Sequence, residues 1–310
     1  MPITDHQREQ RKKRLGASDA AAVLGVSPWS TAFDVWAEKT GRALDGPPLD
    51  KDAVWIGNNV EGPLLDWAAE QTGATIKKNQ YRVHKTAPLH ANHDALDIDF
   101  GASNIGFEAK TSGMIWHSAA DDWGDPDIDP ESVPAHVLTQ CYHQMAVSDL
   151  RRVYVPALIK GRRQLYCVER DDGMVDEIVK RECEWWDKYV VGDVRPPDSA
   201  PSESMIRRLK WEPESVVAVG GREGGLVSTW VVRREQRLEA EKSEEEAKAN
   251  LLALLDGNEA MTFDGHAITY RPTETRRLDQ SKLKTDHPDV WRDCQKTTTS
   301  RTLRYHPKGL

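Results

Sequence analysis

The sequence of 310 residues contains only four cysteines, which show neither a CxxC spacing nor the framework of a disulfide-rich secreted domain. It also contains no apolar run near the ~18–20 residues that a membrane-spanning helix needs. The first sixteen residues are polar and lack the apolar stretch of a signal peptide. These absences predict a cytoplasmic protein with reduced thiols and no membrane segment.

The charge balance does not by itself indicate a nucleic-acid partner, because the chain carries a net charge of −8. Net charge governs solubility and the long-range field, however, and does not fix the character of one face. Basic residues gather over 8–14 and again over 271–310, whereas 121–131 is acidic. Hydrophobic residues make up 38% and charged residues 30%, which is typical of a globular protein of enzyme size.

The periodicity of apolar residues predicts an α/β fold with a mixed central sheet flanked by helices. We expect helices over 18–25, 30–40, 52–72, 134–148 and 174–190, and strands over 75–84, 91–98, 104–111, 153–159 and 164–169. Pro63 predicts a kink or a later start of the third helix. Pro156 predicts that its strand is bulged or lies at an edge of the sheet.

Composition divides the chain into a domain over 1–200, a linker over 201–227, and a C-terminal appendage over 228–310. A run rich in proline opens the linker, and the appendage begins with a charge-rich helix expected over 228–256. Asp264-Gly265 predicts a hairpin behind that helix, followed by a basic segment. We expect the appendage to serve partner binding or subunit contacts.

The strongest chemical signal is Asp94 followed by Glu108-Ala109-Lys110. Residues two apart in a strand share a face, so Glu108 and Lys110 should project together. A hairpin would bring Asp94 beside Glu108, and two converging carboxylates suit a hard cation such as Mg²⁺. A D…ExK spacing also occurs by chance, as surface charges on a hairpin. The other residues around it must therefore distinguish an active site from surface charge.

That order is a helical Glu61, then Asp94, then Glu108-x-Lys110, then a helical Gln140. With Leu15-Gly-Ala-Ser-Asp, Gly57-Asn-Asn-Val-Glu and the run Gln140-Cys-Tyr-His-Gln-Met-Ala-Val, the chain resembles the YqaJ-like viral recombinases, the phage exonucleases of lambda type. They belong to the PD-(D/E)xK nucleases, whose core is restriction-endonuclease-like. The family usually has Ser-Pro-Asp-Gly where this chain has Asn92-His-Asp-Ala95, and Asp97 and Asp99 are alternative ligands.

The resemblance implies a Mg²⁺-dependent exonuclease, with Mn²⁺ as a possible substitute. Asp94 and Glu108 would bind the metal, Glu61 would assist there, Lys110 would position the attacking water, and Gln140 would hold the water or the lysine. Members of the family digest duplex DNA ends from 5′ to 3′, form a trimeric ring, and work with a single-strand annealing protein. It also implies a phage or prophage origin.

A second site is expected where a helix begins at Ser18, because a helix N-terminus attracts anions. With Arg14 nearby, Ser18 would bind the terminal 5′-phosphate of the DNA; an ordinary N-cap is the alternative. Trp29 and Trp116 are further candidates for contacts to the duplex end. Two other functions stay open: an end-independent or RecB-like nuclease of the same superfamily, and a non-catalytic DNA-binding or interaction module.

Overall fold

The computed structural model describes residues 11–44, 51–98, 104–114, 120–197, 199–210, 216–276, 278–296, 303 and 305. The chain forms two compact units, Met1–Pro213 and Glu214–Leu310. Each unit has its own secondary structure, and the functional residues expected from the sequence all lie in the first.

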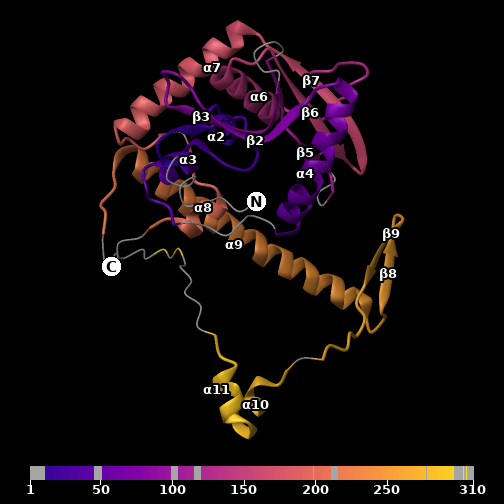
Figure 1. The fold of residues 1–310 in the computed structure, drawn as a ribbon. Coiled ribbons are helices and arrows are strands. Elements are labelled where there is room, and N and C mark those ends of the chain that lie inside the picture. The colour runs from indigo at the N-terminus through magenta and orange to yellow at the C-terminus, as the bar shows by residue number, and fades with distance from the viewer. Residues whose placement is uncertain are drawn as a thin grey trace. The chain divides into compact units, whose positions relative to one another are not determined.

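The N-terminal unit is built on a mixed β-sheet (Figure 1). Its strands are β1 (Leu15–Gly16), β2 (Ile76–Val83), β3 (Leu89–Asp97), β4 (Ile105–Phe107), β5 (Lys110–Ser112), β6 (Arg152–Ile159) and β7 (Arg162–Glu169). The pairs β2–β3, β3–β4 and β6–β7 are antiparallel, whereas β4 and β5 both run parallel to β6. The short β1 adds to the start of β3 in parallel. The sheet therefore carries both kinds of pairing, as expected.

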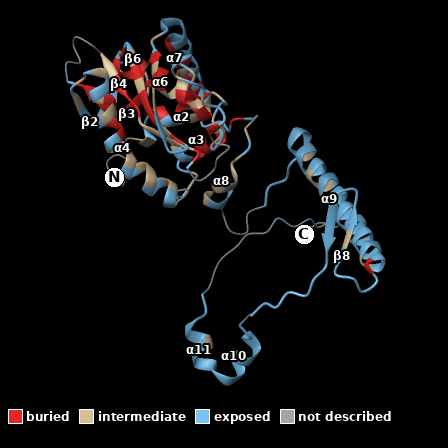
Figure 2. Ribbon diagram, turned by 90° about the vertical axis from the view of Figure 1, so that its right-hand side faces the viewer, coloured by how far each residue is buried: buried red, intermediate tan, exposed pale blue. Residues whose placement is uncertain are grey.

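Helices cover both faces of this sheet. They are α2 (Ala17–Val23), α3 (Ala32–Lys39), α4 (Lys51–Thr72), α6 (Ala135–Ser148), α7 (Asp172–Trp185) and α8 (Glu203–Arg208), and α7 continues as a π-helix over Trp186–Val191. Val153, Val155 and Ala157 of β6 share a buried cluster with α6 and α7. The intervening Tyr154 instead packs with α4, so the strand alternation predicted by the sequence places one helical layer on each face. The predicted α/β class is confirmed, and the buried residues of Figure 2 mark this core.

The structure excludes a later helix start at Pro63 and an edge position for the strand that contains Pro156. Pro63 lies inside α4, which begins at Lys51 and therefore shows no later start. Packing of the next residues, Leu64 and Leu65, in the core favours the helix despite the missing backbone donor. Pro156 lies in β6, which has neighbours on both sides and is not an edge strand. Pro156 has no N–H to donate, and opposite it the pairing of β6 is interrupted between β4 and β5.

The C-terminal unit contains α9 (Gly221–Leu255), the hairpin of β8 (Ala260–Phe263) and β9 (His266–Thr269), α10 (Gln280–Asp286) and α11 (Pro288–Asp293). The hairpin turns at Asp264 and Gly265, which adopt φ of 46° and 80°, as the sequence predicted. Helix α9 starts before residue 228, and α8 lies within the expected linker. Most side chains of α9 are exposed (Figure 2). Among the described helices, we find none with the length and apolarity needed to span a bilayer.

Candidate active site

The strand expected over 104–111 is split in two at the candidate site. β4 ends at Phe107 and β5 begins at Lys110, yet both keep the same register against β6, Phe107 opposite Tyr154 and Lys110 opposite Ala157. That register places Ala109 opposite Pro156, which has no N–H to donate. The Glu108 N–H still donates to the Tyr154 carbonyl oxygen at 3.0 Å, so the chain stays attached to β6 up to Glu108, and the break between β4 and β5 lies opposite Pro156.

Asp94 lies beside Glu108, as the expected hairpin requires. The antiparallel register pairs Ala95 with Phe107, so Asp94 and Glu108 are the next residues of the two strands. The Ala109 N–H donates a hydrogen bond of 2.8 Å to Asp94 Oδ2, which holds this carboxylate beside Glu108. The expected meeting of two acidic side chains and one lysine is thus present.

Glu108 is the centre of a network of buried hydrogen bonds and is only 4% exposed. Its Oε1 accepts from Lys110 Nζ and from Gln140 Nε2, both at 2.6 Å. Lys110 Nζ also donates to Gln140 Oε1 at 2.9 Å, which closes a triangle of three side chains. Gln140, which the resemblance implied would hold the water or the lysine, contacts Lys110.

The charges of this cluster perturb one another. Burial, followed by the nearby Glu108 carboxylate, raises the pKa of Asp94 well above its usual value, while Lys110 opposes the rise and Glu61 adds to it. Burial alone would lower the pKa of Lys110, but Glu108 and Asp94 outweigh it and raise that pKa. Lys110 is therefore held as an ammonium ion, suited to positioning an anionic group rather than to accepting a proton.

The donor set fits one hard divalent cation. Mg²⁺ is commonly held by one or two carboxylates and retains several waters. An ionised carboxylate offers about four acceptor sites, and the described hydrogen bonds use three of them on Glu108. A cation between Asp94 and Glu108 would also relieve the repulsion that raises the Asp94 pKa. Within the described residues, no three His, Cys, Asp or Glu side chains are close enough to form a metal site, so Glu61 does not complete a three-carboxylate centre.

Gln144 is a site residue that the sequence reasoning missed. It is fully buried, and its Nε2 donates to Glu108 Oε2 at 2.6 Å, so that both oxygens of Glu108 are held from α6. Gln144 follows Gln140 by four residues, and this spacing places both amides on one face of the helix. That i, i+4 pair of glutamines was the signal that could have revealed it.

The second expected site, at the start of α2, differs in detail. Gly16, not Ser18, caps the helix, because the Gly16 N–H donates to Asp19 Oδ2 at 2.9 Å. The arginine contact to Ser18 that the structure shows comes from Arg11, whose Nη2 donates to Ser18 Oγ at 3.4 Å. Arg14, the arginine expected here from the sequence, is partly buried.

Asp19 anchors this region. Burial would raise its pKa, but Lys39 at 2.5 Å, with Arg11, outweighs burial and lowers it. Lys39 and Arg11 both act on Asp19, and Arg11 also lies beside the exposed Ser18 hydroxyl of the expected phosphate site.

The remaining histidine and aspartate candidates have partners of their own or lie, like Trp116, outside the described residues. His93 Nε2 lies 2.7 Å from Ser148 Oγ, and burial lowers the pKa of His93 to about 3, which fits a neutral structural side chain. Asp97 ends β3, is buried and has its own interactions. Asp99 and Trp116 lie outside the described residues.

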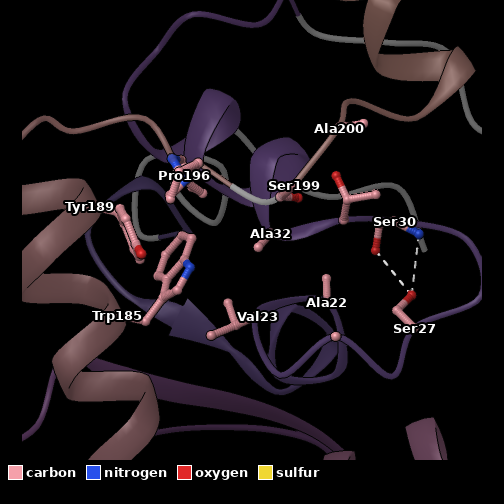
Figure 3. A pocket seen from close by; sticks show the side chains of 13 residues that line it. Ala22, Val23, Ser27, Ser30, Ala32, Trp185, Tyr189, Pro196, Ser199 and Ala200 are labelled. Atoms are coloured by element: carbon pink, nitrogen blue, oxygen red, sulfur yellow. Dashed lines mark hydrogen bonds between the residues drawn. The ribbon is translucent and has the colours of Figure 1, made fainter. Parts of the chain in front are cut away.

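A cavity of about 440 Å³ opens elsewhere in the N-terminal unit (Figure 3). Trp185 and Tyr189 line one side of it, and the loop that follows α2 lines the other. The residues around it include none of the acidic cluster or of the Arg11–Ser18 pair, so the cavity is separate from both sites.

The family model of the YqaJ-like viral recombinase domain matches residues 7–151. The uncharacterized protein YqaJ of Bacillus subtilis (strain 168) is 25% identical over 303 residues, covering 94% of this chain and 91% of its own length.

Among solved structures, the alkaline exonuclease LHK-Exo from Laribacter hongkongensis aligns with a TM-score of 0.47 and 17% identity, over 61% of this chain and 94% of its own. A phage-related exonuclease from Haemophilus somnus 129PT aligns with a TM-score of 0.40 and 13% identity, over 58% and 96%. The resemblance read from the sequence motifs is confirmed by the family match, and the acidic cluster, Lys110 and both glutamines lie in the part of this chain that matches the YqaJ-like viral recombinase domain.

Proposed function

We propose that this protein is a metal-dependent deoxyribonuclease of the phage recombination type, which digests duplex DNA from its ends in the 5′ to 3′ direction. The observation that carries the proposal is the cluster of Asp94, Glu108, Lys110 and Gln140, in which two carboxylates and one ammonium group converge. The match of residues 7–151 to the YqaJ-like viral recombinase domain supports it.

Each side chain has a task in phosphodiester hydrolysis. Asp94 and Glu108 would hold Mg²⁺, or Mn²⁺ in its place, which when bound supplies Lewis-acid stabilisation of the developing phosphate charge. Lys110, kept charged by its carboxylate neighbours, orients the attacking water and attracts the scissile phosphate. Gln140 holds both Lys110 and Glu108, and Gln144 fixes the second Glu108 oxygen, so the cluster is arranged before substrate arrives.

The test compares linear and covalently closed circular duplex DNA in the presence of Mg²⁺ and then of EDTA. We expect digestion of the linear form alone, its loss with EDTA, and a loss of at least ~100-fold in Lys110→Ala, the scale seen when one transition-state contact is removed. Lys180→Ala, an exposed lysine on α7, is the matched control and should keep full activity. Cleavage of the circular form would favour the end-independent nuclease, and full activity in Lys110→Ala would refute the mechanism.

The polarity depends on recognition of the 5′-phosphate by Arg11 and Ser18. Arg11→Ala should therefore weaken the preference for a 5′-phosphate over a 5′-hydroxyl end, and so should Arg14→Ala, which removes the arginine expected from the sequence. Equal preference in wild type and Arg11→Ala would remove this assignment while leaving the hydrolytic centre intact.

A single-strand annealing protein as partner, a ring-shaped trimer and action in a bacterial cytoplasm belong to the same proposal. They are supported by the family resemblance. Co-purification with a co-expressed annealing protein and sedimentation analysis of the free protein test the first two.

A further inference from the structure

Trp29 is an exposed aromatic residue held in a fixed loop. It lies between α2 and α3, and its side chain is 58% exposed, although a tryptophan usually contributes to a core. Ser27 Oγ accepts hydrogen bonds from the Trp29 N–H at 3.3 Å and from the Ser30 N–H at 3.2 Å. The Ser27–Ser30 contacts of this loop are drawn in Figure 3. The backbone that carries the ring is thereby fixed.

The side chain of Trp29 contacts the ring of His136. The two ring centroids are 4.7 Å apart and the planes meet at 83°, an edge-to-face contact that fixes the orientation of the indole. His136 lies near the start of α6, one turn before Gln140 and two turns before Gln144. These three residues share a face of the helix, so Trp29 lies at the rim of the active site.

The charges near His136 argue for an uncharged ligand there. Burial, followed by the positive charge of Lys110, lowers the pKa of His136, so the imidazole is neutral near pH 7 and does not attract phosphate. The carboxylate of Asp122 also acts on His136 and would repel a phosphate. An exposed, neutral aromatic surface beside a phosphodiester-cleaving centre is instead suited to the face of a nucleobase.

We propose that Trp29, supported by His136, is a stacking platform for the 5′-terminal base of the DNA end that enters the active site. This inference rests on the proposed function, since it assigns the platform to the same DNA substrate. Stacking on one aromatic side chain contributes ~1–3 kcal/mol per base, which corresponds to ~5- to 150-fold in affinity.

The experiment is a double-mutant cycle between the ring and the base. Binding is measured by fluorescence anisotropy in EDTA, with a short 5′-phosphorylated duplex and its counterpart that is abasic at the 5′-terminal nucleotide. Wild type should lose ~5- to 150-fold in affinity on removal of the base. Trp29→Leu should bind both duplexes equally weakly, and Trp29→Phe should restore most of the preference for the intact base.

Met174→Ala is the control, because Met174 is an exposed apolar side chain on α7, and it should behave as wild type. Unfolding temperatures of the Trp29 variants should match wild type, given the exposure of the ring. The platform is refuted if Trp29→Leu and wild type lose the same factor on removal of the base. Failure of wild type to digest linear DNA would refute the proposed function instead, so the two failures are distinguishable.

Discussion

A buried ion pair between α6 and α7 should make the stability of this protein decline at alkaline pH. His143 Nδ1 lies 2.8 and 2.9 Å from the two oxygens of Glu182, and His143 Nε2 lies 3.0 Å from the His90 carbonyl oxygen. Carboxylate and carbonyl oxygens only accept, so both ring nitrogens carry a proton and the imidazole is charged. Both side chains are 0% exposed, so solvent does not screen the pair.

The direction of the effect follows from the pKa of His143. Burial would lower that pKa, but Glu182 outweighs burial and raises it above 6.5. The native state therefore holds a proton that the unfolded chain releases above pH ~6.5, and this stabilisation is complete below that pH. It is lost at about 1.4 kcal/mol per pH unit as pH rises towards the native pKa. Burial lowers the pKa of His84, His90 and His93, so these side chains add no slope in this range.

Two variants of Glu182 separate the charge from the packing. Glu182→Leu leaves the buried imidazolium unpaired and should cost ~3–5 kcal/mol, which at ~2–4 °C per kcal/mol lowers the unfolding temperature by ~6–20 °C. Glu182→Gln can donate to a neutral His143, so it should be destabilised less and should lose the decline above pH 6.5. Thermal unfolding followed by circular dichroism between pH 6 and pH 9 measures both. Parallel profiles of wild type and Glu182→Gln would refute the charged state of His143.

Three further outcomes are expected. Gln144→Leu should raise the Mg²⁺ concentration needed for half-maximal DNA digestion by ~10- to 100-fold, because it removes the donor that fixes Glu108 Oε2; an unchanged Mg²⁺ titration would contradict this role. Gly106→Ala should lower the free energy of unfolding by ~1–3 kcal/mol, because its Cβ would lie 2.7 Å from the buried Leu150 Cδ1, and denaturant titration measures the change. Burial raises the pKa of Cys141, so a thiol reagent at pH 8 should modify the exposed Cys294 but leave native Cys141 intact; rapid modification of both would argue against this packing.

The glutamine pair and the broken strand show how far the chemistry could be predicted. The spacing of Asp94, Glu108 and Lys110 was enough to predict that these three side chains converge, because alternate residues of a strand share a face, and the family resemblance added Gln140. That spacing was not enough to predict that the strand breaks after Glu108, since the cause is Pro156, a residue almost fifty positions later that lies opposite the break only after the strands pair.

The site at the start of α2 has a similar explanation. The sequence indicated a helix near Ser18 but did not show which residue would be its N-cap. In the structure Gly16 is the N-cap, and its N–H donates to the Asp19 side chain. Arg11 contacts Ser18, and Lys39 pairs with Asp19 across the loop between α2 and α3. A run of adjacent basic residues does not indicate which of their side chains will contact Ser18.

The sequence by itself determined the α/β class, the boundaries of most helices and hairpins, and the identity of the acidic cluster, because these depend on periodicity, turn residues and side-chain chemistry. Only the tertiary structure decided that Gln144 holds Glu108, that His143 is a buried cation against Glu182, and that Trp29 lies on His136 at the rim of the site. Each of these joins partners separated by 36, 39 or about a hundred residues, and such contacts arise from packing, which no local pattern encodes.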